Sequence, residues 1–175
     1  SGKENLVWSL ENHAHLRDWL PDGRGLIVEI ADPKAGTDIW RLDLGEKPTA
    51  SVFLQTPFNE RASRLSPDGR WLVYSSDESG RDEVYIQSFP SAGAKVQVST
   101  GGGEQPVWSR NGKAVFFRGE GAIQEATFET SPRLAVGKPH SLFPDFYESP
   151  QMSAHTSLDV FPDGRFLMIQ SSDAR

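Results

Sequence analysis

The amino-acid sequence predicts an all-β fold: a partial β-propeller of about three and a half four-stranded antiparallel blades. Three observations support this prediction. A turn motif recurs along the chain, a short apolar run follows each turn, and the spacing of apolar residues nowhere follows a helical period. An ordinary β-sandwich made of similar hairpins is the alternative, but a sandwich has no reason to repeat its turn chemistry.

The turn motif occurs four times. The copies are Leu20-Pro21-Asp22-Gly23, Ser66-Pro67-Asp68-Gly69, Ser109-Arg110-Asn111-Gly112 and Phe161-Pro162-Asp163-Gly164. Asp-Gly and Asn-Gly pairs tolerate positive φ and are strong signals for a hairpin between two strands. The glycines are 46, 43 and 52 residues apart, a spacing that fits one blade per repeat.

Strands are predicted in order around each turn. Solid apolar runs follow the turns at 26–28, 71–74, 114–117 and 166–169, so we expect these second strands to be buried on both faces. Segments 38–44 and 83–89, and more weakly 121–128, alternate between apolar and polar residues and predict third strands. The more polar segments 50–54 and 95–99 predict half-exposed outermost strands.

The repeats divide the chain into units of a single domain that covers residues 1–175. We expect blades at about 12–56, 57–103 and 104–148, and a partial blade at 149–175. An open blade exposes an apolar face and an unpaired edge. We therefore expect the partial blade to be completed by a strand at 4–10. That strand comes either from the same chain, giving about four blades, or from a second chain in a homodimer that closes the propeller.

Composition excludes several classes of function. The 175 residues include 18 basic and 24 acidic side chains, a net charge of -6, and no cysteine. The missing cysteines exclude disulfides, thiolate zinc sites and thiol catalysis, and the acidic balance disfavours nucleic acid. No apolar run approaches the roughly 20 residues of a membrane helix, so we expect no direct membrane insertion. Residues 1–10 do not read as a signal peptide, and the compartment is left open.

Several segments are similar to a known family. Residues 56–61, 65–74, 76–85, 98–103, 106–109 and 158–169 resemble TolB-like, WD-repeat-like propeller repeats. The resemblance is nearest to the C-terminal propeller of bacterial eukaryote-like serine/threonine protein kinases. It implies a sensory or partner-binding part held outside the membrane, in an extracytoplasmic (periplasmic) location. The kinase motifs themselves are absent. The chain departs from the family pattern at Arg110, which replaces the turn proline, and at Leu20 and Phe161, which replace the turn serine.

Candidate binding residues come from aligning the turns. Counting back five positions from the first residue of each motif gives His15, Arg61, Glu104 and Thr156. In a propeller these positions precede the innermost strands, so we expect them to surround one mouth of the central channel. Such a polar ring is suited either to a small ligand or peptide end, or to a water-filled vestibule. Asp77, Arg81 and Arg118 are expected on connecting loops that face the same side, where a rigid scaffold commonly displays binding residues.

Three other motifs lack the context of a catalytic or metal site. His13 and His15, with Asp18 nearby, are too few for a metal site and have no marked partner elsewhere. The glycines at 101–103 are followed by neither lysine nor helix, so they predict an inter-blade link rather than a phosphate loop. The acidic run at 77–83 does not match a calcium loop and predicts a solvated hairpin loop.

The sequence therefore predicts a non-enzymatic binding module. We expect it to recognise a protein or peptide through residues at the mouth of its channel, with no catalytic residue, metal or cofactor. Two alternatives stay open. One is an enzyme, either a propeller hydrolase or the accessory domain of a prolyl-peptidase-like enzyme that lacks its catalytic domain. The other is a purely structural fragment without a ligand of its own.

Overall fold

A computed structural model describes residue 6, residues 8–9, 12–147 and 156–169. Within these residues the chain forms fifteen strands and no helix. The strands are β1 (His13–Trp19), β2 (Gly25–Asp32), β3 (Gly36–Asp43), β4 (Thr49–Leu54), β5 (Glu60–Leu65), β6 (Trp71–Ser76), β7 (Glu83–Ser88), β8 (Lys95–Gln97), β9 (Glu104–Trp108), β10 (Ala114–Gly119), β11 (Ala122–Glu129), β12 (Ala135–Val136), β13 (His140–Pro144), β14 (Leu158–Val160) and β15 (Phe166–Met168).

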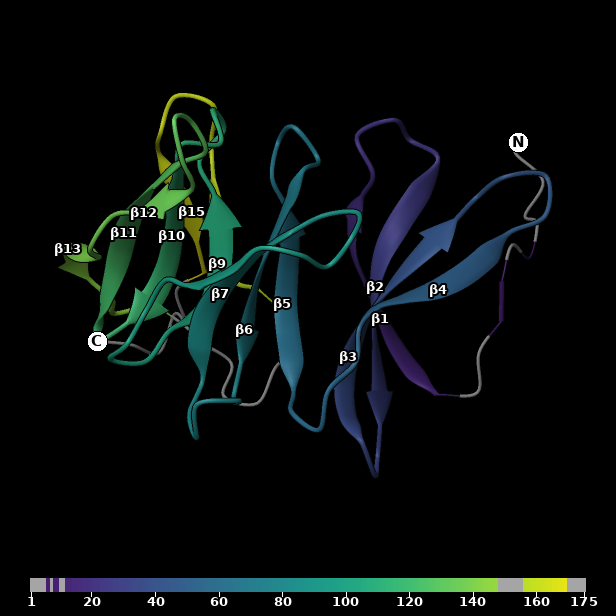
Figure 1. Cartoon of the computed structure of the whole chain (residues 1–175). Coiled ribbons are helices and arrows are strands. Elements are labelled where there is room, and N and C mark those ends of the chain that lie inside the picture. The colour runs from purple at the N-terminus through teal and green to yellow at the C-terminus, as the bar shows by residue number, and fades with distance from the viewer. Residues whose placement is uncertain (1–5, 7, 10–11, 148–155, 170–175) are drawn as a thin grey trace.

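The strands form four antiparallel sheets in chain order. The first sheet has the order β1-β2-β3-β4 and the second β5-β6-β7-β8. The third has the order β9-β10-β11-β12, with β13 also paired to β11, and the fourth holds β14 and β15. Figure 1 shows the sheets side by side, from the first at the right of the view to the third and fourth at the left. The first strands of consecutive sheets contact one another, so β1, β5, β9 and β14 surround a common axis.

Turn chemistry sets the hairpins between the first and second strands. The four motif glycines have φ between 67° and 86°, a region that favours glycine. In the second and third sheets the motif serine also caps the turn. The Ser66 and Ser109 hydroxyl groups accept hydrogen bonds from the Trp71 and Ala114 backbone N–H groups at 3.0 and 2.9 Å. The hairpins predicted from Asp-Gly and Asn-Gly are therefore confirmed.

The fourth hairpin has a different register. In the first three hairpins the residue before the turn motif pairs with the residue seven positions later, whereas Val160 pairs with Phe166, six positions later. A one-residue slip turns every side chain of a strand to the opposite face. Phe166 and Met168 pack against the third sheet, whereas Leu167 and Ile169 lie on the opposite face and are 56% exposed, so the prediction that the last apolar run is buried on both faces is wrong. The slip decides which side chains lie on that face. Leu20 also lacks the serine hydroxyl and keeps the longer loop, so the missing hydroxyl of Phe161 does not by itself explain the shorter one.

Apolar layers fill the spaces between the sheets. In β6, Leu72 and Tyr74 pack toward the first sheet, while Val73 packs toward the third. This alternation confirms that the apolar run at 71–74 is buried on both faces. A third layer, between the third and fourth sheets, includes Ile123 and Leu158. Each fully buried aliphatic or aromatic side chain contributes about 1.5–3 kcal/mol, so the layers hold the sheets face to face.

A buried ion pair lies within the first sheet, and its carboxylate also bonds to the second sheet. Arg17 Nη2 in β1 lies 2.6 Å from Glu29 Oε2 in β2, with the two side chains 6% and 0% exposed. The other carboxylate oxygen of Glu29 accepts hydrogen bonds from the Ser63 N–H and hydroxyl groups in β5, both at 2.7 Å. Burial raises the pKa of Glu29, and the charge of Arg17 opposes this shift.

The strand predicted at 4–10 lies largely outside the described residues. Among the described residues of that segment, Trp8 packs against the outer face of the first sheet, beside Leu26, Val28 and Leu42. Closure of the sheets into a ring, within one chain or between two, stays a prediction.

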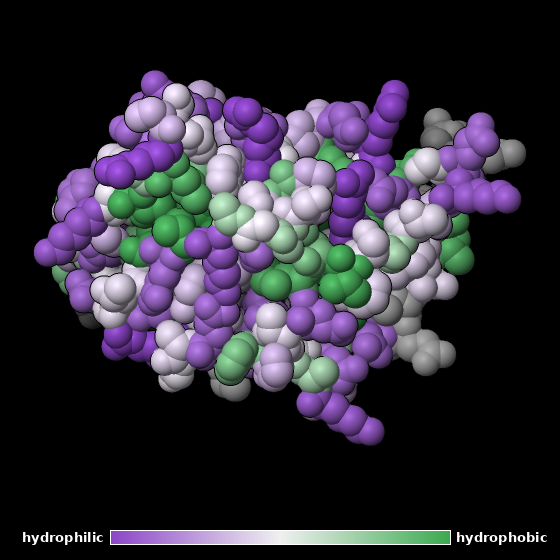
Figure 2. Space-filling model, viewed as in Figure 1, coloured by the Kyte–Doolittle hydropathy of each residue, from purple (hydrophilic) through white to green (hydrophobic). Residues whose placement is uncertain are grey.

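The outer surface is mainly polar. Figure 2 shows hydrophilic side chains over most of this view, with apolar surface gathered over the third sheet and near the middle of the molecule. No helix in the described part of the chain is long and apolar enough to cross a membrane.

Candidate functional site

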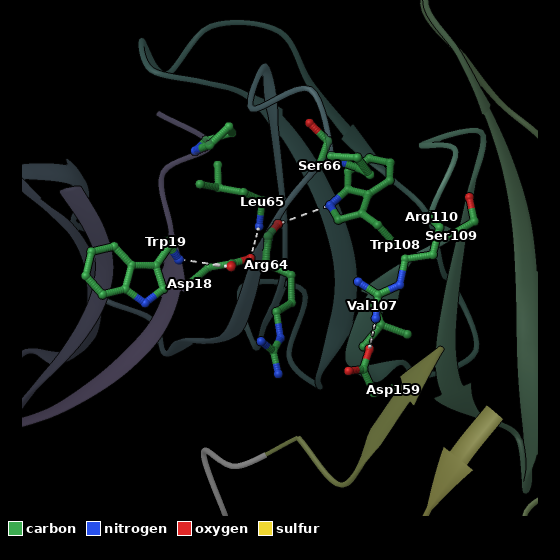
Figure 3. A pocket seen from close by; sticks show the side chains of 12 residues that line it. Asp18, Trp19, Arg64, Leu65, Ser66, Val107, Trp108, Ser109, Arg110 and Asp159 are labelled. Carbon is green, nitrogen blue, oxygen red and sulfur yellow. Dashed lines mark hydrogen bonds and ion pairs between the residues drawn. The ribbon is translucent and has the colours of Figure 1, made fainter. Parts of the chain in front are cut away.

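A pocket lies on the axis where the four sheets meet. Its volume is about 330 Å³, and every sheet contributes to its lining. The position two residues before each turn motif supplies one lining side chain per sheet: Asp18, Arg64, Val107 and Asp159. Figure 3 shows these side chains around the pocket, with Arg64 near its centre. We call this hollow the axial pocket.

Irregular pairing in the innermost strands positions these side chains. The register of β1 shifts between Leu16 and Asp18, and that of β5 shifts between Arg61 and Arg64. The β9–β10 pairing shifts in the same part of the third sheet. Ala62 and Gln105, within the shifted parts of β5 and β9, have φ of 53° and 51°. Such bulges bend a strand and re-aim the side chains that follow, here toward the axis.

Asp18 is held in place by backbone groups. Its Oδ2 accepts a hydrogen bond from the Leu65 N–H at 3.1 Å, and its Oδ1 accepts one from the Trp19 N–H at 3.0 Å. Burial raises the pKa of Asp18 above its usual value, and the charge of Asp159 adds to this shift. The two N–H groups and the charge of Arg64 oppose it. Asp18 therefore links β1 to β5, and its pKa depends on the charges of Arg64 and Asp159 in the axial pocket.

The cationic side chains are Arg64 and Arg110. Arg64 Nη1 donates a hydrogen bond to the Arg17 carbonyl oxygen at 3.2 Å, which steadies the guanidinium in the pocket. Arg110 Nε donates to the Val160 carbonyl oxygen at 2.7 Å, and its Nη2 lies 3.8 Å from Asp159 Oδ1. The side chains of Arg110 and Asp159 are 55% and 62% exposed, so solvent screens that pair.

Aromatic side chains form the walls. The Trp108 Nε1–H group donates to the Arg64 carbonyl oxygen at 3.1 Å, and Trp108 is 7% exposed. Trp19 is 59% exposed and lines the pocket together with Pro21 and Pro67. Figure 3 shows the Trp19 ring pointing away from Arg64 and Asp159, so the axial pocket combines its cationic and anionic groups with apolar surface from Trp108 and the two prolines.

Of the four residues predicted to surround a channel mouth, Arg61 and Glu104 lie near each other. Arg61 in β5 donates to Asp82 Oδ1 at 2.8 Å, and Glu104 pairs with Arg118 across the β9–β10 ladder. Burial of its carboxyl group raises the pKa of Glu104, Asp82 adds to the shift, and the charges of Arg118 and Arg61 oppose it. Arg61, Glu104 and Arg118 therefore lie within electrostatic reach of one another.

The other two members of that ring have different surroundings. His15 is half-buried in β1, and its ring lies 4.6 Å from that of His13 in an edge-on contact. Thr156 lies just before β14, and its hydroxyl is buried with no hydrogen-bond partner among the described residues. His15, Arg61 and Glu104 lie within the innermost strands rather than before them.

Of the predicted loop residues, two lie on a loop and one does not. Asp77 and Arg81 lie between β6 and β7. Burial raises the pKa of Asp77, but two hydrogen bonds from Asn59 and the charge of Arg61 outweigh it and lower that pKa. Arg81 Nε donates to Glu83 Oε1 at 2.7 Å.

The loop position expected for Arg118 is wrong. Arg118 lies within β10 and is only 3% exposed. It forms an ion pair with Asp145 and donates to the Ser157 hydroxyl at 3.2 Å, so it joins the third sheet to the residues before β14.

The glycine run does not present a free anion cradle. The Gly102 N–H group donates to Glu83 Oε1 at 3.1 Å, and the Gly103 N–H group donates to the Asp82 carbonyl oxygen at 2.9 Å. These bonds connect the link at 101–103 to the second sheet. Among the described residues, no group of three or more His, Cys, Asp or Glu side chains is placed to hold a metal ion.

The sequence contained a signal for the axial pocket that our alignment did not use. The pocket-lining residues lie two positions before each turn motif, whereas we selected those five positions before it. The column two before the turn reads Asp, Arg, Val and Asp, and so holds three charged residues, against the four polar residues of the column five before it. A bulge separates the two columns, so sequence spacing alone does not show which of them faces a pocket.

The stacked antiparallel sheets, with innermost strands around an axial pocket, define a β-propeller-type protein. The structure is similar to the solved structure of a putative TolB from Agrobacterium tumefaciens, with a TM-score of 0.60 and 16% sequence identity over 77% of this chain and 52% of that chain. For TolB from Acinetobacter baumannii the TM-score is 0.46, with 14% identity over 79% of this chain and 45% of that chain. This chain thus spans about half the length of either protein.

The fold is therefore the TolB-like β-propeller fold, and the predicted fold class is confirmed. No protein-family model matches the sequence. The nearer resemblance to the propellers of bacterial kinases stays a prediction.

Proposed function

We propose that this chain is a non-enzymatic module that binds a protein partner through a peptide segment, with the axial pocket as its binding site. The observation that carries the proposal is the convergence of Asp18, Arg64 and Asp159, from three different sheets, on one hollow. Binding residues displayed by several elements of a rigid scaffold are typical of recognition sites.

The chemistry of the pocket fits a peptide. Arg64 is half-buried, and its single described hydrogen bond uses Nη1, which leaves other N–H groups available for a carbonyl or carboxylate oxygen. Asp18 and Asp159 offer acceptors for peptide N–H groups or a cationic side chain. Pro21, Pro67 and Trp108 offer apolar surface beside them. The residues predicted at the other mouth stay proposed as secondary contacts.

A displayed library of linear peptides tests this proposal. Peptides selected on the wild-type chain are expected to bind Arg64→Gln about tenfold or more weakly, since a hydrogen bond to a charged group is worth about 1.5–3 kcal/mol. Asp159→Asn is expected to weaken the same peptides, because it removes a charged acceptor from the pocket. Affinities are measured by fluorescence polarisation.

Arg133→Gln is the matched control, because Arg133 is exposed and lies in the loop between β11 and β12, away from the axial pocket. It should leave the affinities unchanged. Unchanged binding by both Arg64→Gln and Asp159→Asn would contradict the proposal. So would turnover of ester, peptide or glycoside substrates, which would instead support the enzymatic alternative.

We further propose that two chains form a homodimer that closes the propeller.

A further inference from the structure

A second hollow lies between the third and fourth sheets and joins the axial pocket. Its volume is about 600 Å³, and we call it the 3–4 groove. The third sheet and its turn supply Arg110, Lys113 and Phe116, and the fourth supplies Val160 and Phe161. Ser109 and Arg110 line both the groove and the axial pocket, so a ligand chain can pass from one to the other.

The groove presents two cations on an acidic protein. Lys113 is exposed, and no carboxylate of the described residues lies within ion-pairing distance of its ammonium group. Arg110 donates to the Val160 carbonyl oxygen, and its ion-pair contact among the described residues is the long, solvent-exposed one to Asp159. Glu125, the carboxylate that lines the groove, lies 3.4 Å from His140 Nε2. With a net charge of -6 on the whole chain, a local cationic groove attracts an acidic ligand that the rest of the surface repels.

The groove also has an apolar wall. Phe161 is 40% exposed, and the Arg165 guanidinium lies 5.2 Å from the centre of its ring. Phe116 is half-buried and packs edge-on against Phe166 at 5.0 Å. Phe161 occupies the turn position that Ser66 and Ser109 hold in the second and third sheets. Of these three positions, only the one in the fourth sheet carries an aromatic side chain.

The groove between the second and third sheets differs in charge. That hollow, about 480 Å³, also contains Lys113, but it is lined by the carboxylates of Asp68 and Glu129. Because two carboxylates accompany the one lysine there, the hollow between the second and third sheets does not favour an acidic ligand. Two of the three departures from the turn pattern, Arg110 in place of proline and Phe161 in place of serine, fall on the 3–4 groove, whereas Leu20 does not.

We propose that the 3–4 groove binds an extended acidic peptide segment of the partner protein. A carboxylate of that segment contacts Lys113 and Arg110, and an apolar side chain packs against Phe161. The segment continues into the axial pocket, so this inference rests on the proposed function and specifies its ligand class.

Two soluble fluorescein-labelled peptides test the inference. One is rich in glutamate with a single phenylalanine, and the other replaces each glutamate with lysine. The acidic peptide is expected to bind wild type about tenfold or more tightly than its lysine counterpart, by an amount that falls as salt rises. Lys113→Glu is expected to weaken the acidic peptide about fivefold or more, because it replaces attraction with repulsion.

Lys47→Glu, the same charge change at an exposed site between β3 and β4, should leave binding unchanged. Equal binding of the two peptides, or equal effects of Lys113→Glu and Lys47→Glu, would overturn the groove assignment. If Arg64→Gln still weakens selected peptides in that case, the axial pocket stands without the groove. If Lys113→Glu alone weakens binding, the groove stands and the axial pocket does not.

Discussion

Replacing Arg17 with methionine is expected to lower the free energy of unfolding by about 3–5 kcal/mol, because it leaves the Glu29 carboxylate buried without its counter-charge. Both side chains of this pair are almost completely buried, and Glu29 also holds Ser63 of the neighbouring sheet. Loss of Arg17 removes the charge that opposes the raised pKa of Glu29, so that pKa rises further. Chemical denaturation measures the change.

The pH dependence distinguishes this mechanism from a loss of packing. With its pKa raised further, Glu29 is protonated at acidic pH and its burial then costs less, so the effect of Arg17→Met should be smaller at acidic than at alkaline pH. Adding Glu29→Gln should recover part of the loss, since glutamine is neutral and can still accept the bonds from Ser63. A loss independent of pH, with no recovery in the double variant, would mean that Arg17 acts through packing alone.

The second large effect is a fall in stability as the pH rises toward neutrality. Glu60 is fully buried at the start of β5, and burial raises its pKa from 4.5 to about 7. Thr56 Oγ1 donates to Glu60 Oε1 at 2.6 Å, while Glu60 Oε2 is buried without a partner among the described residues. The nearby charge of Asp38 adds to the shift, and Lys95 opposes it.

The sign follows from proton binding. Between pH 4.5 and about 7 the folded chain holds a proton on Glu60 that the unfolded chain has released, so stability decreases as pH rises through this window. Above the window both states are ionised and the loss is complete. At 1.36 kcal/mol for each pKa unit, the contribution amounts to at most about 3 kcal/mol.

Glu60→Gln isolates this contribution, because Asp18, Glu29 and Glu104 also have raised pKa values and add slope of the same sign. We expect the variant to lose less stability than wild type between pH 5 and pH 7.5, measured as thermal midpoints and free energies of unfolding. Glu46→Gln, at an exposed position, is the control and should follow the wild-type curve. Equal slopes for wild type and Glu60→Gln would show that Glu60 ionises normally in the folded chain.

Local sequence chemistry was sufficient to predict the hairpins. The Asp-Gly and Asn-Gly pairs place a positive φ at the turn, and the hydroxyl groups of Ser66 and Ser109 fix the loop length through a bond only five residues away. The solid apolar run of β6 predicted burial on both faces because neighbouring sheets cover both sides of this strand. The serine hydroxyl alone does not decide the register, because the hairpin at Leu20 keeps the seven-position pairing and the hairpin at Phe161 does not.

The candidate site was less predictable because its residues are far apart in the chain. Arg118 was expected on a loop, but Asp145, 27 positions later, pairs with it inside the protein. Asp18 and Arg64 meet only because β1 and β5 lie side by side on the axis, after bulges have re-aimed them. No pattern within a single repeat encodes the position of these bulges relative to a pocket.

The sequence by itself determined that the chain is all-β, where its strands turn, and which faces of the second strands of the inner sheets are buried, because these properties depend on residues a few positions apart. The tertiary structure alone decided which polar column faces the axis, that Leu167 and Ile169 lie on the face of the fourth sheet turned away from the third, and that Arg110 and Phe161 share one groove. These features depend on how separate sheets stack, and stacking brings together residues that one repeat or more separates in the chain.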